Sequence, residues 1–265
     1  MKELHIYDDF LTTFLDKKLT DEHKAIVYEI RAKISPVLGF IPRAIPNYTN
    51  HGVQHSTNVA KLFSNFSQNL YTFKHELSEP ETYLISLCIW LHDVGCLIAN
   101  EDGEDTHHLK SIEVLESNAF SRLRKRIDVD DFNCIKAMIL FHSSSEKDLN
   151  DVPVCEMANV RLKLICAIFR LLDDCDISGG RNSDILYNLL TEKNLLDKQS
   201  IPHWRAHISI GAVGFYQDKF VVECANVCDG ERSIKNLADE LAKINKVFKE
   251  AGFPTFTLSV IPPEY

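Results

Sequence analysis

The sequence lacks the features that mark membrane-spanning, secreted and fibrous proteins. Its longest apolar candidate, residues 83–91, stops at His92 and Asp93, well short of the roughly 18 apolar residues that a membrane-spanning helix requires. The first five residues have neither the charged region nor the apolar stretch of a signal peptide. With only 10 Gly and 9 Pro, the composition excludes collagen-like, low-complexity and disordered chains. We therefore expect a folded cytoplasmic protein.

Basic residues are also in deficit. The chain has 29 Lys and Arg against 38 Asp and Glu, which gives a formal net charge of −9. A negative charge of this size opposes general binding to the phosphate backbone of nucleic acid and to anionic lipid. A small anionic ligand in a local site remains compatible with it. We therefore expect a small substrate, and neither long nucleic acid nor a membrane as a partner.

Disulfide bonds are not needed in this chain, because 265 residues can bury a sizeable core. Most of the eight Cys lie inside apolar segments such as residues 164–168, where a free Cys behaves as a small buried hydrophobe. Cys224 and Cys228 are separated by three residues, but no second pair lies nearby, which disfavours a closed zinc site. We expect the thiols to be reduced.

Helical periodicity dominates the first 200 residues. Thr20 is placed to cap a helix that runs to about Leu38, and the capping box of residues 78–81 starts another that ends near His92. Further helices are expected over about residues 50–71, 106–123, 129–142 and 155–176.

The pattern changes after residue 200. Residues 204–215 and 219–225 are rich in β-forming residues and flank a turn at 216–218, which predicts a hairpin. A helix then begins at Asp229-Gly230, and residues 254–261 can return as a strand. The predicted fold class is mainly α, with a helical domain over residues 1–200 and a small α+β subdomain over residues 201–265.

Two histidines and a His-Asp pair stand at the ends of predicted helices. His51 and His55 are four residues apart, which places both imidazoles on one face of a helix. The pair His92-Asp93 ends the next apolar helix.

Carboxylates also stand at the end of the helix expected over residues 155–176, after its apolar run at residues 162–172. Asp173, Asp174 and Asp176 follow its strongly apolar run, and the interval from 173 to 176 puts two carboxylates on one side. An ionised carboxylate is costly to bury there without a cation. A divalent metal ion is the simplest partner.

Together these segments resemble the HD superfamily of metal-dependent phosphohydrolases. The matching segments are Asn50-His51-Gly52-Val53-Gln54-His55-Ser56, Trp90-Leu91-His92-Asp93-Val94-Gly95 and Phe169-Arg170-Leu171-Leu172-Asp173-Asp174-Cys175-Asp176-Ile177. The resemblance implies an HD-type helical bundle in which His55, His92, Asp93 and Asp173 hold a metal ion, with Asp93 able to bridge to a second ion. A weaker similarity links the layout to HD modules found beside chaperone-type ATPases.

Two-metal HD proteins add two further histidines. His107 opens one predicted helix and His142 closes the next, so they match these places, with His108 as an alternative to His107. Imidazole and carboxylate ligands without thiolate suit one or two Mn, Fe, Ni, Zn or Mg ions. Such ions lower the pKa of a bound water so that hydroxide can attack phosphorus.

Asp93 and His51 are the predicted catalytic residues. His51 resembles the general acid of HD proteins that cleave cyclic nucleotides, and the alternative is a histidine that only hydrogen-bonds a neighbouring carboxylate. Many HD phosphohydrolases carry Lys where this chain has Cys96. Candidates for phosphate contact are instead Lys110, Arg181 and Arg170, of which Arg170 better suits an ion pair with a nearby Asp. His108 is a further candidate for substrate binding.

The leading interpretation is a phosphohydrolase acting on a nucleotide or another small phosphoester. One alternative is an HD-fold di-iron oxygenase, which uses almost the same ligands. Another is a non-catalytic metal-binding regulatory module that binds a protein partner through the region after residue 200. The aromatic residues Trp204, Phe215, Tyr216 and Phe220 mark the expected interface there, unless they lie in the core. A homo-oligomer is also compatible with the sequence.

Overall fold

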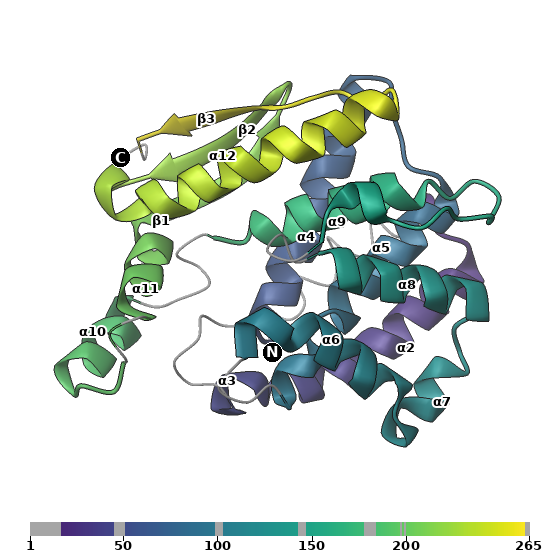
Figure 1. Cartoon of the computed structure of the whole chain (residues 1–265), viewed down its shortest axis with the longest axis horizontal. Helices are drawn as coiled ribbons and strands as arrows, with labels where there is room; N and C mark the ends of the chain where they lie inside the picture. The colour runs from purple at the N-terminus through teal and green to yellow at the C-terminus, as the bar shows by residue number, and fades with distance from the viewer. Residues whose placement is uncertain are drawn as a thin grey trace. The chain divides into compact units, whose positions relative to one another are not determined.

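The computed structural model describes residues 17–44, 51–98, 103–142, 147–177, 184–196, 198 and 200–262. These residues are mainly helical, with a small sheet and a long helix near the C-terminus (Figure 1). The fold class predicted from the sequence is therefore confirmed. The chain forms two compact units, one of residues 1–40 and 76–170 and the other of residues 41–75 and 171–265. The predicted boundary at residue 200 stays a prediction.

The first unit is built from helices. They are α2 (Asp21–Leu38), α5 (Glu79–Leu91), η1 (Val94–Leu97), α6 (Gly103–Glu116), η2 (Asn118–Phe120), α7 (Ser121–Arg124), α8 (Val129–Phe141), η3 (Leu149–Asp151) and most of α9 (Leu162–Asp174). Helix α5 packs against α2 and α8, and α6 packs against η1 and α8. Every residue of α5 from Glu81 to Leu91 is buried, so α5 is the central helix of this unit.

Local capping explains where two of these helices begin. The Thr20 side chain accepts a hydrogen bond from the backbone N–H of His23, as predicted. Ser78 and Glu81 form the predicted capping box. Glu81 is also buried against the guanidinium of Arg161, 2.6 Å away, which ties the start of α5 to the segment that enters α9.

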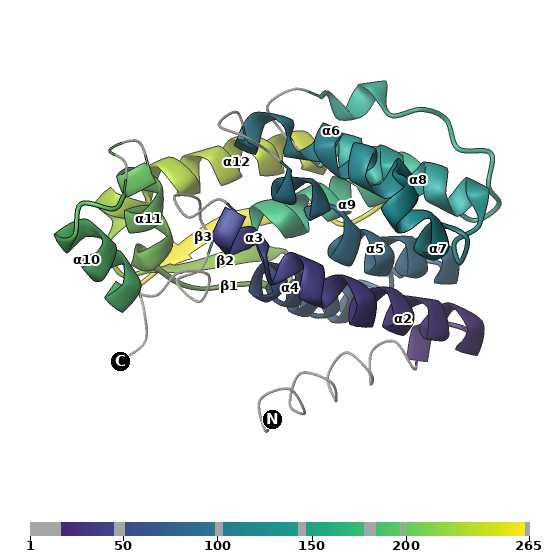
Figure 2. The same ribbon diagram turned by 90° about the horizontal axis from the view of Figure 1, so that it is seen from below.

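The second unit combines helices with a three-stranded sheet. Its elements are α3 (Ile41–Ala44), α4 (Val53–Thr72), α10 (Asp184–Glu192), α11 (Ser200–Ser209), β1 (Ile210–Tyr216), β2 (Lys219–Cys224), α12 (Val227–Glu250) and β3 (Thr257–Ile261). Strand β2 lies between β1, its antiparallel neighbour, and β3, its parallel neighbour. Helix α12 is the crossover from β2 to β3, and it runs along the sheet (Figures 1 and 2).

Aromatic rings form the core between α4 and the sheet. The ring of Phe66 lies 5.0 Å from that of Phe215, 5.8 Å from that of Phe256 and 6.2 Å from that of Phe248. All four side chains are buried. Polar contacts align the same elements, because the Asn65 side chain accepts a hydrogen bond of 2.7 Å from the backbone N–H of Phe215.

Two sequence-based element predictions are wrong. Residues 204–209 belong to helix α11 and not to a strand, because the buried residues Trp204 and His207 repeat at a helical interval of three. Helix α9 begins at Leu162 and not near residue 155, since Asn159 adopts a left-handed conformation (φ 63°) that a helix excludes.

The predicted helix over residues 106–123 is divided. Helix α6 ends at Glu116, and the extended backbone of Ser117 separates it from the short helices η2 and α7. The helix predicted over about residues 50–71 is α4, and its N-cap is Gly52. No helix of the described part of the chain has the length and apolar character needed to cross a membrane.

Three of the four aromatic residues expected at an interface are in the core. Trp204, Phe215 and Phe220 are buried, and Tyr216 is 66% exposed. The ring of Trp204 stacks on that of Tyr187 at a centroid distance of 6.4 Å. The sheet aromatics therefore serve mainly to pack this unit.

Candidate metal centre

His92 and Asp93 stand where α5 ends and η1 begins. His92 is the C-cap of α5, and its Nδ1 lies 3.2 Å from the carbonyl oxygens of both Cys88 and Ile89. Its Nε2 lies 3.3 Å from Asp93 Oδ2. Contact between Nδ1 and backbone carbonyls holds a histidine ring in the orientation that presents Nε2 to a ligand. The end of α5 therefore directs an imidazole and a carboxylate to one point.

His107 and His142 reach the other oxygen of Asp93 and each other. His107 Nε2 lies 3.6 Å from Asp93 Oδ1 and 2.9 Å from His142 Nε2. His142 Nδ1 lies 2.5 Å from the carbonyl oxygen of Ile139, to which it donates, so the neutral ring presents an Nε2 lone pair to the cluster. One ligand atom from each of Asp93, His107 and His142 lies within 4.8 Å of the others, and all three side chains are buried.

These side chains suit a divalent cation. Two imidazole nitrogens and a carboxylate, without thiolate, are ligands for Zn, Fe, Ni or Mn. A metal ion accepts lone pairs from both Nε2 atoms, whereas without an ion one of two rings so close must donate a proton to the other. The buried Asp93 carboxylate also gains a cation as its partner. The Asp93, His107 and His142 cluster can therefore hold a metal ion of unidentified type.

A glycine allows these elements to approach. The Gly95 N–H donates a hydrogen bond of 2.8 Å to Ser111 Oγ, which joins η1 to α6. A Cβ at Gly95 would overlap the backbone nitrogen of Ser111 and the carbonyl oxygen of His107. Only a residue without a side chain fits here, so Gly95 sets the approach of Asp93 to His107.

The other predicted residues of this region lie around the cluster. The His108 ring is fully buried, with its centroid 6.3 Å from that of His142. Lys110 forms an exposed ion pair with Glu113 at 2.8 Å. The buried Cys96 thiol lies 3.9 Å from Asp93 Oδ1, so the position that often carries Lys in HD proteins supplies no cation here.

The second unit brings together His55 and two carboxylates at the C-terminal end of α9, Asp173 in its last turn and Asp176 just beyond it. His55 Nε2 lies 2.9 Å from Asp173 Oδ1, and its Nδ1 lies 2.7 Å from Asp176 Oδ2. Asn58 Nδ2 donates to the other oxygen of Asp176 at 2.9 Å. His55 and Asp176 are each about 1% exposed, and Asp173 is more accessible. The His51 ring lies 5.7 Å from the His55 ring.

Asp176 and Asn58 were not predicted as site residues. The sequence indicates Asp176 only as a second carboxylate beside Asp173, because its contact with His55 joins residues 121 positions apart. The spacing of His55 and Asn58, three residues apart on one helix, was the available signal for Asn58. Arg181, a predicted phosphate contact, lies outside the described residues.

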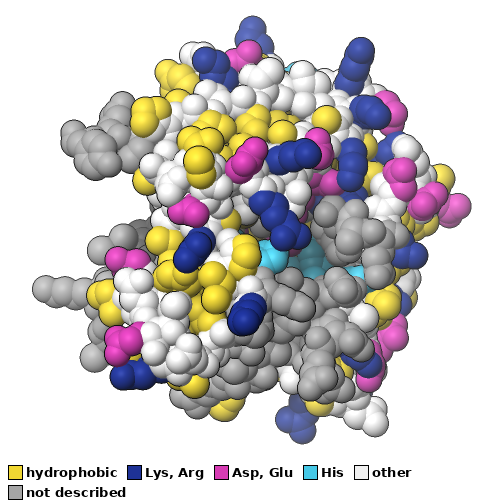
Figure 3. Space-filling view, turned by 60° about the vertical axis from the view of Figure 1, so that its left-hand side comes forward, with side chains coloured by type: hydrophobic (Ala, Val, Ile, Leu, Met, Phe, Trp, Pro, Cys, Tyr) yellow, Lys and Arg dark blue, Asp and Glu magenta, His cyan; other side chains and the backbone are white. Residues whose placement is uncertain are grey.

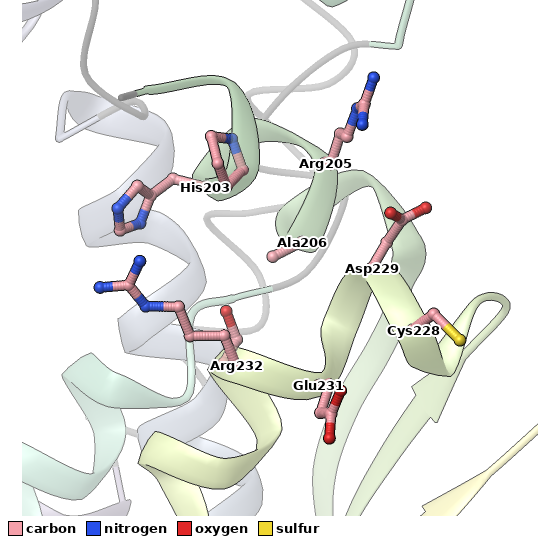
Figure 4. Close-up of a pocket in the computed structure, with 9 residues that line it drawn as sticks. His203, Arg205, Ala206, Cys228, Asp229, Glu231 and Arg232 are labelled. Atoms are coloured by element: carbon pink, nitrogen blue, oxygen red, sulfur yellow. The ribbon is translucent and has the colours of Figure 1, made fainter. Parts of the chain in front are cut away.

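A separate pocket of about 260 Å³ lies between α11 and the first turns of α12. His203 and Arg232 extend to one side of it, and Cys228 and Asp229 lie on the other (Figure 4). Glu231 and Arg205 also line it, and Arg205 Nε donates to the Tyr187 hydroxyl at 2.9 Å. Because basic and acidic groups are mixed here, the lining favours neither sign of charge in a ligand. Among the residues that the structure describes, no predicted catalytic, metal-binding or substrate-binding residue lines this pocket.

Comparison with known families gives one match that covers most of the chain. A model of the HD-CE family matches residues 45–249, a range that contains His55, the His92-Asp93 pair and Asp173. No curated protein matches the chain. Since the matched range covers well over half of the sequence, the chain belongs to the HD-CE family, an HD-like family.

Proposed function

We propose that this protein is a metal-dependent phosphohydrolase of the HD type. His55, His92, Asp93 and Asp173 would hold one divalent ion, and His107 and His142 would hold a second ion that Asp93 bridges. The observation that carries the proposal is the convergence of the His107 and His142 Nε2 atoms on the Asp93 carboxylate. Membership of the HD-CE family supports the proposal that His55 and Asp173 share a metal ion with His92 and Asp93.

The chain's own groups are suited to these roles. The two oxygens of Asp93 face different histidines, with Oδ2 toward His92 and Oδ1 toward His107, as a bridging carboxylate requires. Asp176 holds His55 Nδ1 so that Nε2 is directed to Asp173.

When bound, the metal ions would lower the pKa of a coordinated water and offset charge on the phosphoryl group. His51, which lies beside His55, is the proposed donor of a proton to the leaving oxygen.

The proposed substrate is a small phosphoester such as a nucleotide. The net charge of −9 opposes a polyanionic substrate. On the face drawn in Figure 3, described Lys and Arg side chains lie among Asp and Glu side chains rather than in a continuous basic surface. Lys110 and Arg181 are the proposed phosphate contacts. Lys110 would have to leave Glu113 or share it with the substrate.

Elemental analysis followed by an activity screen tests this function. Protein purified without chelator should contain one or two divalent ions per chain and should hydrolyse at least one member of a panel of nucleotides and cyclic nucleotides with Mn, Mg or Ni. Asp93→Asn should remove both metal content and turnover. Asp239→Asn, a change on the exposed side of α12, should leave both unchanged. Equal turnover by wild type and Asp93→Asn would reject the proposal and favour a regulatory module.

A di-iron oxygenase is the second candidate, and Cys96 favours it. A buried thiol stands beside Asp93 in place of the lysine that would bind phosphate. Two iron ions per chain, a di-iron Mössbauer signal and no phosphoester turnover would establish this alternative.

A further inference from the structure

A group of three sulfur atoms lies in the first unit, on α8 and on the segment between η3 and α9. The Cys134 and Cys155 sulfur atoms are 3.6 Å apart, and the Cys134 thiol donates to Met157 Sδ at 3.5 Å. Cys134 is buried in α8, whereas Cys155 is partly exposed in the segment that follows η3. Two thiols in contact, one of them reachable from solvent, form the arrangement from which a disulfide can close.

We propose that Cys134 and Cys155 are a redox-sensitive pair that forms a reversible disulfide. A disulfide needs its sulfur atoms at about 2.05 Å, so the two atoms must approach by about 1.6 Å from 3.6 Å. Residues 152–156 belong to neither helix nor strand, and Val154 is 93% exposed. Cys155 can therefore move toward α8 without breaking a helix or a strand ladder.

The surroundings of the pair favour a neutral product. Burial, followed by contact with Cys155 and by the charge of Asp131, raises the pKa of Cys134 to about 12. Cys134 is therefore a thiol at neutral pH, and the more accessible Cys155 is the residue that reacts first. Closing the disulfide leaves no charge beside Asp131, whereas a thiolate would be repelled by it.

The reaction balances with a small-molecule disulfide as oxidant. The Cys155 thiolate attacks one sulfur of oxidised glutathione, which forms a mixed disulfide and releases one reduced glutathione. Cys134 then loses its proton and attacks the Cys155 sulfur as a thiolate, which releases the second glutathione, whose sulfur takes up the proton. Two electrons pass from the protein thiols to the glutathione disulfide. The product joins α8 to the segment that leads into α9.

Peptide mapping of the full chain tests the pair. The folded protein is exposed to oxidised glutathione, its remaining thiols are alkylated, and the digest is examined by mass spectrometry. The expected product is a cross-linked peptide that contains Cys134 and Cys155 and is lost on reduction. Cys228→Ser, which removes an exposed thiol, should leave this cross-link unchanged, and Cys155→Ser should abolish it.

Several outcomes would overturn the proposal. One is that Cys134 and Cys155 remain reduced, and are therefore alkylated, while Cys228 becomes glutathionylated. Glutathionylation of Cys228 shows that the oxidant was present and effective. Others are a stable glutathione adduct on Cys155 and a cross-link from Cys134 to the buried Cys166. Cu(I) retained by the purified protein and lost in Cys134→Ser would show that the sulfur group is a metal site instead.

Discussion

The backbone N–H of Gly95 donates a 2.8 Å hydrogen bond to the Ser111 hydroxyl, and this contact joins the end of the His92-Asp93 segment to the helix that carries His107. The two backbones are so close that a Cβ at residue 95 would overlap Ser111 and His107. The geometry of the Asp93 cluster therefore depends on a residue that has no side chain.

Replacing Gly95 by Ala should disrupt this approach. The added methyl group must push η1 away from α6, which we expect to cost about 1–3 kcal/mol of unfolding free energy. It should also reduce metal content, because Asp93 moves away from His107. Urea unfolding and elemental analysis measure both effects. Gly211→Ala is the control, since its Cβ would meet nothing closer than Glu223 at 3.6 Å. Wild-type metal content in Gly95→Ala would show that this approach is not required for binding.

Replacing Asp176 by Asn should weaken metal binding without unfolding the protein. His55 Nδ1 and Asn58 Nδ2 face different oxygens of Asp176, and an Asn carries an NH2 donor in place of one of them, so it cannot accept at both positions. Loss of such a histidine-orienting carboxylate typically lowers metal affinity by about 10–100-fold. Competition titration of Mn with a chelator measures the change, and an Asp239→Asn variant is the exposed control. Unchanged affinity would mean that His55 is not a ligand or that its orientation is set elsewhere.

The Glu81–Arg161 pair should make stability depend on pH at the acidic end. Burial alone would raise the pKa of Glu81, but hydrogen bonds from Arg161 and the backbone outweigh it, so the pKa is lowered from 4.5. A lowered folded-state pKa means that the stabilisation is complete above about pH 4.5 and is lost as the pH falls through the folded value.

The variant Glu81→Gln should therefore be less stable by about 1–3 kcal/mol at neutral pH. Its stability should also fall less steeply than that of the wild type below pH 4.5. Urea midpoints over a pH series measure both effects. Glu192→Gln, which alters an exposed pair with Lys193, should behave as wild type. Parallel pH curves for wild type and Glu81→Gln would contradict the assignment.

Truncating Phe66 should strongly destabilise the protein. Its ring packs against Phe215, Phe248 and Phe256 and is fully buried, so Phe66→Ala should cost about 3–5 kcal/mol. Tyr71→Ala, on the same helix but at a position 51% exposed, should cost much less. Thermal and urea unfolding compare the two, and equal losses would show that the aromatic core contributes little.

Local signals made much of the helical framework predictable. Thr20 and Ser78 satisfy backbone N–H groups within three residues of themselves, so their roles follow from short-range chemistry. Residues 204–209 show the opposite case. A short segment rich in apolar residues fits both periods, and only packing against the rest of the second unit selects the helix.

The site shows the same division. His51, His55, the His92-Asp93 pair and Asp173 could be selected by residue type and order along the chain. The choice between His107 and His108 could not, because adjacent residues at a helix start differ only in the direction that packing gives them. The structure groups His107 with Asp93 and His142 and buries His108 beside them. That His107 binds a metal ion stays a prediction.

The sequence by itself determined the mainly helical class, the principal helix caps and the set of imidazoles and carboxylates available to a cation, because these depend on residue chemistry and short-range spacing. Tertiary structure alone decided which oxygen of Asp93 faces which histidine, that Asp176 holds His55, and that β3 pairs in parallel with β2. The physical reason is that these contacts join residues far apart in the chain, and their geometry depends on how buried surfaces pack.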